Sequence, residues 1–139
     1  STLMRSSAAS DVYKRQGRTP DWYLRQLNGH KHLIIGNHDK ATLDCENAAK
    51  YLESVEKMQH VTDEDKQICL CHYPLAEWYK SRHGSWLIYG HIHGARDEVY
   101  EFMKTRERAL NAGACINNYT PVSFNELVRN NKAFQEKDS

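Results

Sequence analysis

Three polar motifs each follow a short apolar run, and their residue types are typical of a metal site. They are Gly-Asn-His-Asp at residues 36–39, His72, and Gly-His-Ile-His-Gly at residues 90–94. Ligands in α/β sheets gather beyond the carboxyl ends of strands, so we expect these motifs to share one rim. Imidazole nitrogens together with amide or carboxylate oxygens suit zinc, iron, manganese or nickel. The sequence therefore indicates a transition-metal site.

Each motif taken alone also has a simpler interpretation. A histidine such as His72 after a strand is more often a buried, hydrogen-bonded residue or a surface residue than a ligand. Asn37 or Asp39 could instead cap a helix that follows the turn. His91 and His93 favour a metal even by themselves, because two histidines bracketed by glycines serve packing poorly. The order of the motifs and their shared position after three strands favour the metal interpretation for all of them.

Small and apolar residues are expected to shape these turns. Gly36, Gly90 and Gly94 permit tight backbone turns that aim short ligands inward. Ile92 lies between the two histidines, and we expect it to anchor their loop in apolar surroundings.

The remaining histidines and the nearby aromatic residues are given simpler roles. Tyr73 and Trp78 are expected to pack rather than to stack on a nucleobase. His30 and His32 are expected to be solvent-exposed, and His60 and His83 to lie in polar surroundings, with a position near the substrate as the alternative for His83.

Short strands and helices must hold the motifs in place. Strands are expected at residues 33–35, 67–71, 86–89 and 110–114. Helices are expected after Thr19, at residues 48–57 and at residues 123–135, with a strand near residues 55–61 as the alternative for the second half of the middle helix. Ser123 with Glu126 three residues later is the pattern of a capping box. Strands that alternate with helices predict an α/β fold.

Length and composition narrow the possible classes of protein. A chain of 139 residues is enough for one domain, and its 40% hydrophobic and 27% charged residues are ordinary for a globular one. The net charge of +1 gives no overall basic field, so we expect no stable nucleic-acid binding. No apolar run approaches the roughly 20 residues of a membrane span, so we expect no membrane association.

The cysteines and the start of the chain complete this description. No Cys-x-x-Cys pair occurs, and Cys69 and Cys71 would point to the same face of a strand as small buried hydrophobes. Reduced thiols and a cytoplasmic location are the expectation. Residues 1–16 are small, polar and basic without a clear period, which predicts a non-native or disordered tail.

In order and spacing, the motifs at residues 36–39, 72 and 90–93 resemble the second half of the calcineurin-like metallophosphoesterase signature. The residues around 27–39 and 117–122 are similar to small prokaryotic or phage-type members, and the resemblance covers about residues 17–134. It implies an α/β fold in which a mixed-sheet β-sandwich is flanked by helices in four layers. Residues 17–139 would then be the C-terminal portion of a single domain that is incomplete at its N-terminus.

The resemblance also implies roles for individual residues. It gives four side chains as metal ligands, three on one ion and the last on a second: Asn37, His72, His91 and His93. His38 would be the catalytic histidine, which is not a ligand, and Asp39 would orient it by accepting an N–H. The intact family uses two divalent ions, of manganese, iron, zinc or nickel. They activate a hydroxide that hydrolyses a phosphomonoester or phosphodiester, here of a small molecule or a nucleotide.

The sequence departs from the family at its first two motifs. The family begins with Asp-x-His and continues with a Gly-Asp whose aspartate bridges the metals, and neither pair occurs in these 139 residues. Of the ligands to the second ion only His93 remains, so at most one ion should be well held and hydrolysis should be impaired. A non-catalytic metal-binding or regulatory remnant of the same fold is the alternative, and an incomplete gene product without function is a third interpretation.

Overall fold

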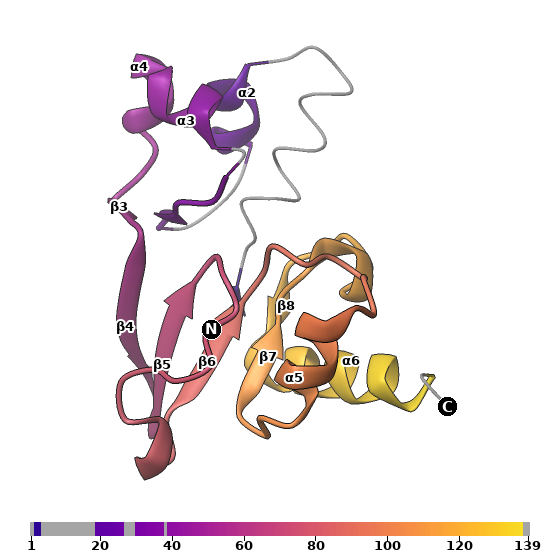
Figure 1. Ribbon diagram of the computed structural model, residues 1–139. Coiled ribbons are helices and arrows are strands. Elements are labelled where there is room, and N and C mark those ends of the chain that lie inside the picture. Colours follow the sequence, from indigo (N-terminus) through magenta and orange to yellow (C-terminus); the bar gives the residue numbers. More distant parts are fainter. Residues whose placement is uncertain (1, 4–18, 27–29, 38, 138–139) are drawn as a thin grey trace.

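A four-stranded mixed sheet forms the centre of the protein (Figure 1). Its strands, in spatial order, are β4 (Met58–Asp63), β5 (Lys66–Cys71), β6 (Trp86–Tyr89) and β7 (Ala109–Asn111). β4 and β5 form an antiparallel hairpin, whereas β5, β6 and β7 run parallel to one another. The computed structural model describes residues 2–3, 19–26, 30–37 and 39–137. Within them the mixed α/β class predicted from the sequence is confirmed.

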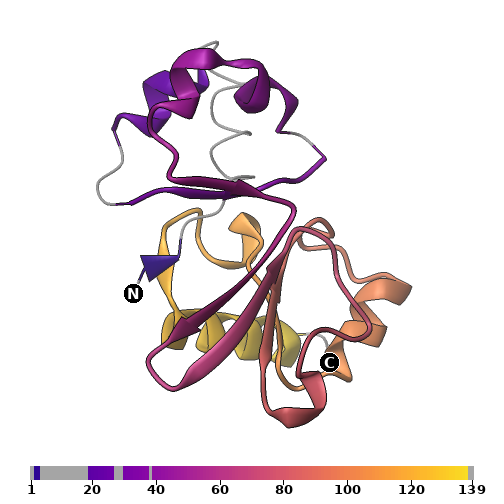
Figure 2. The same ribbon diagram turned by 90° about the vertical axis from the view of Figure 1, so that its left-hand side faces the viewer.

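A second, smaller sheet lies next to the N-terminal end of β4. It consists of the parallel strands β2 (His32–Ile34) and β3 (Ser54–Glu56), and β3 leads directly into β4. Figure 2 shows this sheet between the central sheet and a group of short helices. Those helices are α2 (Pro20–Leu24), α3 (Lys40–Asp44) and α4 (Glu46–Ala49).

Among the described residues, the remaining elements are two helices, two 3₁₀ turns and one further pair of strands. They are the helices α5 (Glu98–Lys104) and α6 (Phe124–Glu136), the 3₁₀ turns η1 (Ser81–His83) and η2 (Ala114–Ile116), and the paired strands β1 (Thr2–Leu3) and β8 (Val122–Ser123). Within the predicted tail at residues 1–16, Thr2 and Leu3 are the residues that the structure describes. None of the helices in the described ranges is both long and apolar enough to cross a membrane.

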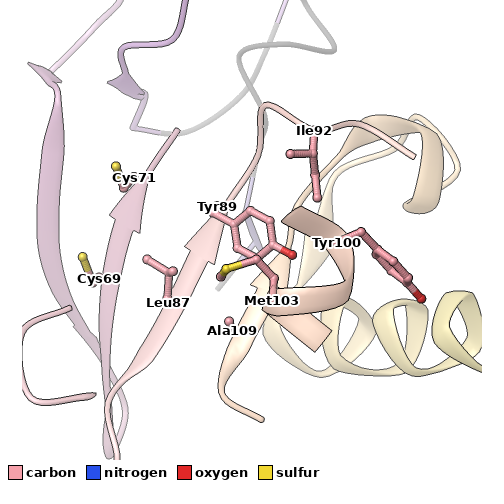
Figure 3. Packing of buried hydrophobic residues seen from close by; sticks show 8 residues of the cluster. All are labelled: Cys69, Cys71, Leu87, Tyr89, Ile92, Tyr100, Met103 and Ala109. Carbon is pink, nitrogen blue, oxygen red and sulfur yellow. The ribbon is translucent and has the colours of Figure 1, made fainter. Parts of the chain in front are cut away.

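The central sheet buries a different set of side chains on each face. One face packs against α5, and Figure 3 shows the eight buried residues of the cluster formed by the sheet, α5 and the loop after β6: Cys69, Cys71, Leu87, Tyr89, Ile92, Tyr100, Met103 and Ala109. The other face packs against the start of α6 through Phe124 and Leu127, with Ile68 and Ile88 from the strands. Successive residues of β5 and β6 alternate between the two faces, as the two-residue period of a strand requires.

The predicted strands are largely confirmed, whereas one predicted helix is wrong. The strands at residues 67–71 and 86–89 are present within one residue, and the strand expected at 110–114 ends at Asn111. The helix expected at 48–57 ends already at Ala49, and the alternative strand forms instead as β3 and β4. The backbone N–H of Glu53 donates to the carbonyl of Lys31 at 2.7 Å, so pairing with β2 overrides the helical period.

Capping explains one helix that was predicted and one that was not. Ser123 caps α6, since its hydroxyl accepts from the backbone N–H of Glu126 at 3.3 Å and donates to the Glu126 carboxylate at 2.9 Å. This confirms the predicted cap at Ser123, although the Glu126 carboxylate accepts from the Ser123 hydroxyl, whereas a full capping box uses the Ser123 backbone N–H. Asp97 caps the unpredicted α5 by accepting from the backbone N–H of Tyr100 at 3.0 Å.

The buried thiol of Cys69 should make the free energy of unfolding depend on pH in the alkaline range. Burial, and next the neighbouring Cys71, raise the pKa of Cys69 to about 11 from an ordinary value of 9.0. The unfolded chain therefore loses this proton first, so the free energy of unfolding should fall as the pH rises from about 9 through about 11. Urea titrations across this range should show a smaller decline for Cys69→Ala, and the parent decline for Cys115→Ala at an exposed position. An equal decline of the free energy of unfolding in all three proteins would show that Cys69 is not its cause.

Candidate metal centre

Loops that follow three different strands bring Asn37, His72 and His91 together. Asn37 follows β2, His72 follows β5 and His91 follows β6. The Nε2 atom of His72 lies 2.8 Å from Oδ1 of Asn37. The rings of His72 and His91 lie nearly perpendicular, with centroids 5.2 Å apart. Three of the four predicted ligands thus share one place, although β2 belongs to a different sheet from β5 and β6.

A close approach of the backbone fixes the ring of His72. A Cβ atom at Gly36 would lie 2.6 Å from Nδ1 of His72, so only glycine fits there. His72 is buried, and its carbonyl accepts from the backbone N–H of Gly90 at 2.8 Å. Contacts on the Gly36 side and on the Gly90 side therefore hold the middle ligand in place.

The carboxylate of Asp39 closes the turn that contains the first ligand. Its Oδ2 accepts from the backbone N–H of Gly36 at 2.7 Å, and the residue is buried. Asp39 occupies the N-cap position of α3, but its side chain makes no capping hydrogen bond, so that alternative is wrong for this carboxylate. His38 lies outside the described residues, and so does its predicted contact with Asp39.

The backbone of the second histidine motif is strained at the histidines and not at the glycines. His91 and His93 have φ values of 72° and 52°, in the left-handed region that costs a non-glycine residue about 1–3 kcal/mol. The tight turns expected at Gly36, Gly90 and Gly94 do not use positive φ at these residues, and the glycine with positive φ in the described residues is Gly84. Ile92 is buried in the core between sheet and helix, as predicted (Figure 3).

His93 is exposed, as Asn37 is, and its backbone carbonyl accepts from the Nδ2 of Asn111 at 2.9 Å. Among the described residues, no group of three or more histidine, cysteine, aspartate or glutamate side chains is arranged to hold a metal ion. The trio of Asn37, His72 and His91 is not such a group, because one of its members is an asparagine.

Sequence reasoning missed two residues at this centre. Tyr73 was expected to pack, but it is exposed, and its ring lies against His72 and His91 with centroid distances of 5.0 Å and 4.7 Å. Its position directly after His72 was the available signal. Asn111 is buried beneath the histidine loop, and no local pattern distinguished it.

The predictions for Trp78, His30 and His32 are confirmed. Trp78 is partly buried against the core, as predicted. His30 and His32 are exposed, as predicted, and both contact the carboxylate of Glu53.

Two proteins without an assigned function resemble this chain. The uncharacterized protein MJ1445 of Methanocaldococcus jannaschii is 28% identical over 106 residues, which are 76% of this chain and 52% of that protein. The crystal structure of AQ665 from Aquifex aeolicus, a protein of unknown function, matches with a TM-score of 0.57 and 28% identity, covering 77% of this chain and 66% of that one. The chain thus spans about half the length of its curated relative. No protein-family model matches the chain.

Proposed function

We propose that this chain carries part of the active site of a metal-dependent phosphate-ester hydrolase of the calcineurin-like metallophosphoesterase type. The observation that supports the proposal is the convergence of Asn37, His72 and His91 from the ends of three strands. The four-layer sandwich of that family, a cytoplasmic location, and a phosphomonoester or phosphodiester of a small molecule or nucleotide as substrate belong to the same proposal.

The chemistry of the trio fits one divalent ion. An amide oxygen and two imidazole nitrogens are ligands that transition metals accept. Adjacent ligand atoms at about 2.1 Å from an octahedral ion lie about 3 Å apart, close to the 2.8 Å between Oδ1 of Asn37 and Nε2 of His72. The hydrogen-bonded pair thus has a spacing that two neighbouring ligands of one ion would also have.

The chain's own residues would divide the work around the metals. The ions would polarise the phosphate oxygens and lower the pKa of water. Asn37, His72 and His91 would hold one ion, and His93 would contribute to the second. His38 would protonate the leaving oxygen, and Asp39 would fix the turn that contains it by accepting from Gly36.

A non-catalytic metal-binding domain is the second candidate. It is favoured by the absence of Asp-x-His and Gly-Asp from these 139 residues, because a bridging carboxylate is what places two ions side by side. Both candidates require the ion assigned to Asn37, His72 and His91. Only the hydrolase would also turn over phosphate esters, so an activity assay distinguishes the two.

Removing one histidine of the trio should remove the ion. Substituting a residue that only supports a ligand already costs about 10–100-fold in metal affinity, so His72→Ala and His91→Ala should each cost at least about 100-fold. Elemental analysis after equilibration with Mn²⁺ or Zn²⁺ should find one ion per parent chain and almost none in either variant. His60→Ala, at an exposed histidine on β4, should bind as the parent does. Equal metal in all four proteins, or none in the parent, would contradict the proposal.

A further inference from the structure

We propose that Asn111 is a positioning residue for the histidine loop at residues 91–93, a role that rests on the proposed metal centre. Asn111 ends β7 and lies opposite Tyr89, which ends β6. The backbone N–H of Ala112 donates to the carbonyl of Tyr89 at 2.8 Å. The end of β7 is thus fastened beside the strand end from which the histidine loop departs.

Both ends of the Asn111 amide are used by backbone groups. Its Nδ2 donates to the carbonyl of His93 at 2.9 Å, and its Oδ1 accepts from the N–H of Gly113 at 2.7 Å. Asn111 is 4% exposed, so each of these polar groups needs a protein partner. A primary amide offers a donor and an acceptor together, whereas a carboxylate of the same size only accepts.

Two further asparagines form hydrogen bonds with the backbone of Asn111. The backbone N–H of Asn111 donates to Oδ1 of Asn131 at 2.8 Å, and its carbonyl accepts from Nδ2 of Asn131 at 2.9 Å. Nδ2 of Asn117 donates to the same carbonyl at 3.3 Å. Asn117 and Asn131 are also buried. Helix α6 and the segment after β7 therefore fix the backbone from which the Asn111 side chain reaches the histidine loop.

The loop needs such a restraint because its backbone is strained. His91 and His93 both have left-handed φ values, a conformation that persists only where surrounding contacts over-determine it. The hydrogen bond to the His93 carbonyl fixes the orientation of the peptide that follows His93. The directions of both imidazoles depend on this backbone, so Asn111 acts on the ligands through the loop.

An isosteric substitution isolates this hydrogen bond. Asn111→Asp keeps the size and the acceptor for Gly113 and removes the donor to His93. The matched control is Asn125→Asp, which introduces the same charge at an exposed asparagine of α6. Calorimetric titration with Zn²⁺ alone should show binding about 10–100-fold weaker for Asn111→Asp and unchanged for Asn125→Asp. Urea titrations give the stability of both variants, so that affinity can be compared with folding.

A second readout needs no metal. The imidazole ¹H–¹⁵N resonances of His91 and His93 should shift in metal-free Asn111→Asp and stay in place in Asn125→Asp. If the parent binds no Zn²⁺, the proposed metal centre fails, but these resonances still test the role of Asn111. Unchanged resonances in folded Asn111→Asp would overturn that role.

The role is also testable if the aspartate variant does not fold. Asn111→Ser introduces no buried charge and shortens the side chain, so it also removes the hydrogen bond to His93. It should then show the same shifts of the His91 and His93 imidazole resonances. In the parent chain, the side-chain amide hydrogens of Asn111 should exchange at least about 10-fold more slowly than those of the exposed Asn118. Equal exchange rates would show that the bond to His93 is not formed and would overturn the proposal without any substitution.

Discussion

Replacing Gly36 with alanine should abolish metal binding at the candidate centre while the chain stays folded. The new methyl group would lie 2.6 Å, 2.7 Å and 2.9 Å from Nδ1, Cε1 and Cγ of His72, which are atoms of a rigid ring. His72 is buried, so its ring must leave the Oδ1 of Asn37 or the turn must open. Either movement separates two ligands, and we expect Mn²⁺ or Zn²⁺ affinity to fall by at least about 100-fold in calorimetric titrations.

A second glycine provides the control for stability. Overpacking at Gly36 should cost about 1–3 kcal/mol of the free energy of unfolding, so a loss of metal could reflect a weakened fold. Gly84→Ala should cost about 1–2 kcal/mol through its φ of 91°, with nothing within 4 Å of the new methyl group. We therefore expect urea titrations to find both variants destabilised and only Gly36→Ala deficient in metal. Parent affinity in folded Gly36→Ala would contradict the assignment of His72.

The sequence predicted the parts of the site that depend on strand ends. Strands at residues 67–71 and 86–89 were visible as short apolar runs, and the polar residues after them lie together as expected. The cap at Ser123 was visible because its partner lies only three residues away. Each strand is marked by a local apolar run and the cap by a partner three residues away, so one stretch of sequence contains the signal for each element.

The features that were missed depend on contacts between distant residues. Asn111 is functional in our interpretation because it faces the carbonyl of His93, 18 residues earlier in the chain. The need for Gly36 comes from the ring of His72, and not from its own backbone angles. The helix predicted at 48–57 gave way to pairing between β2 and β3, which no local period reveals. Sequence patterns locate the strand ends, whereas close approaches between loops require the folded chain.

These 139 residues should hydrolyse phosphate esters several powers of ten more slowly than a version that carries a grafted Asp-x-His and Gly-Asp segment. Catalysis at this kind of centre requires two neighbouring ions, and a bridging carboxylate is needed to hold them together. In this sequence His93 is the one predicted ligand of the second ion. A single imidazole does not retain an ion against water. The loss of even one positioned electrostatic group costs about 10²–10³ in rate, and here a whole ion is at stake.

The comparison can be made with two generic substrates. Both proteins would be assayed with Mn²⁺ on bis-p-nitrophenyl phosphate and p-nitrophenyl phosphate, together with His38→Ala versions of each. We expect turnover in the grafted protein and its loss on substitution of His38, because that residue would protonate the leaving oxygen. Robust turnover by the ungrafted chain that depends on Mn²⁺ and His38 would show that its own residues suffice to hold both ions. A grafted protein that folds and binds two ions without turnover would favour the non-catalytic metal-binding domain, since the metals would then be present without the chemistry.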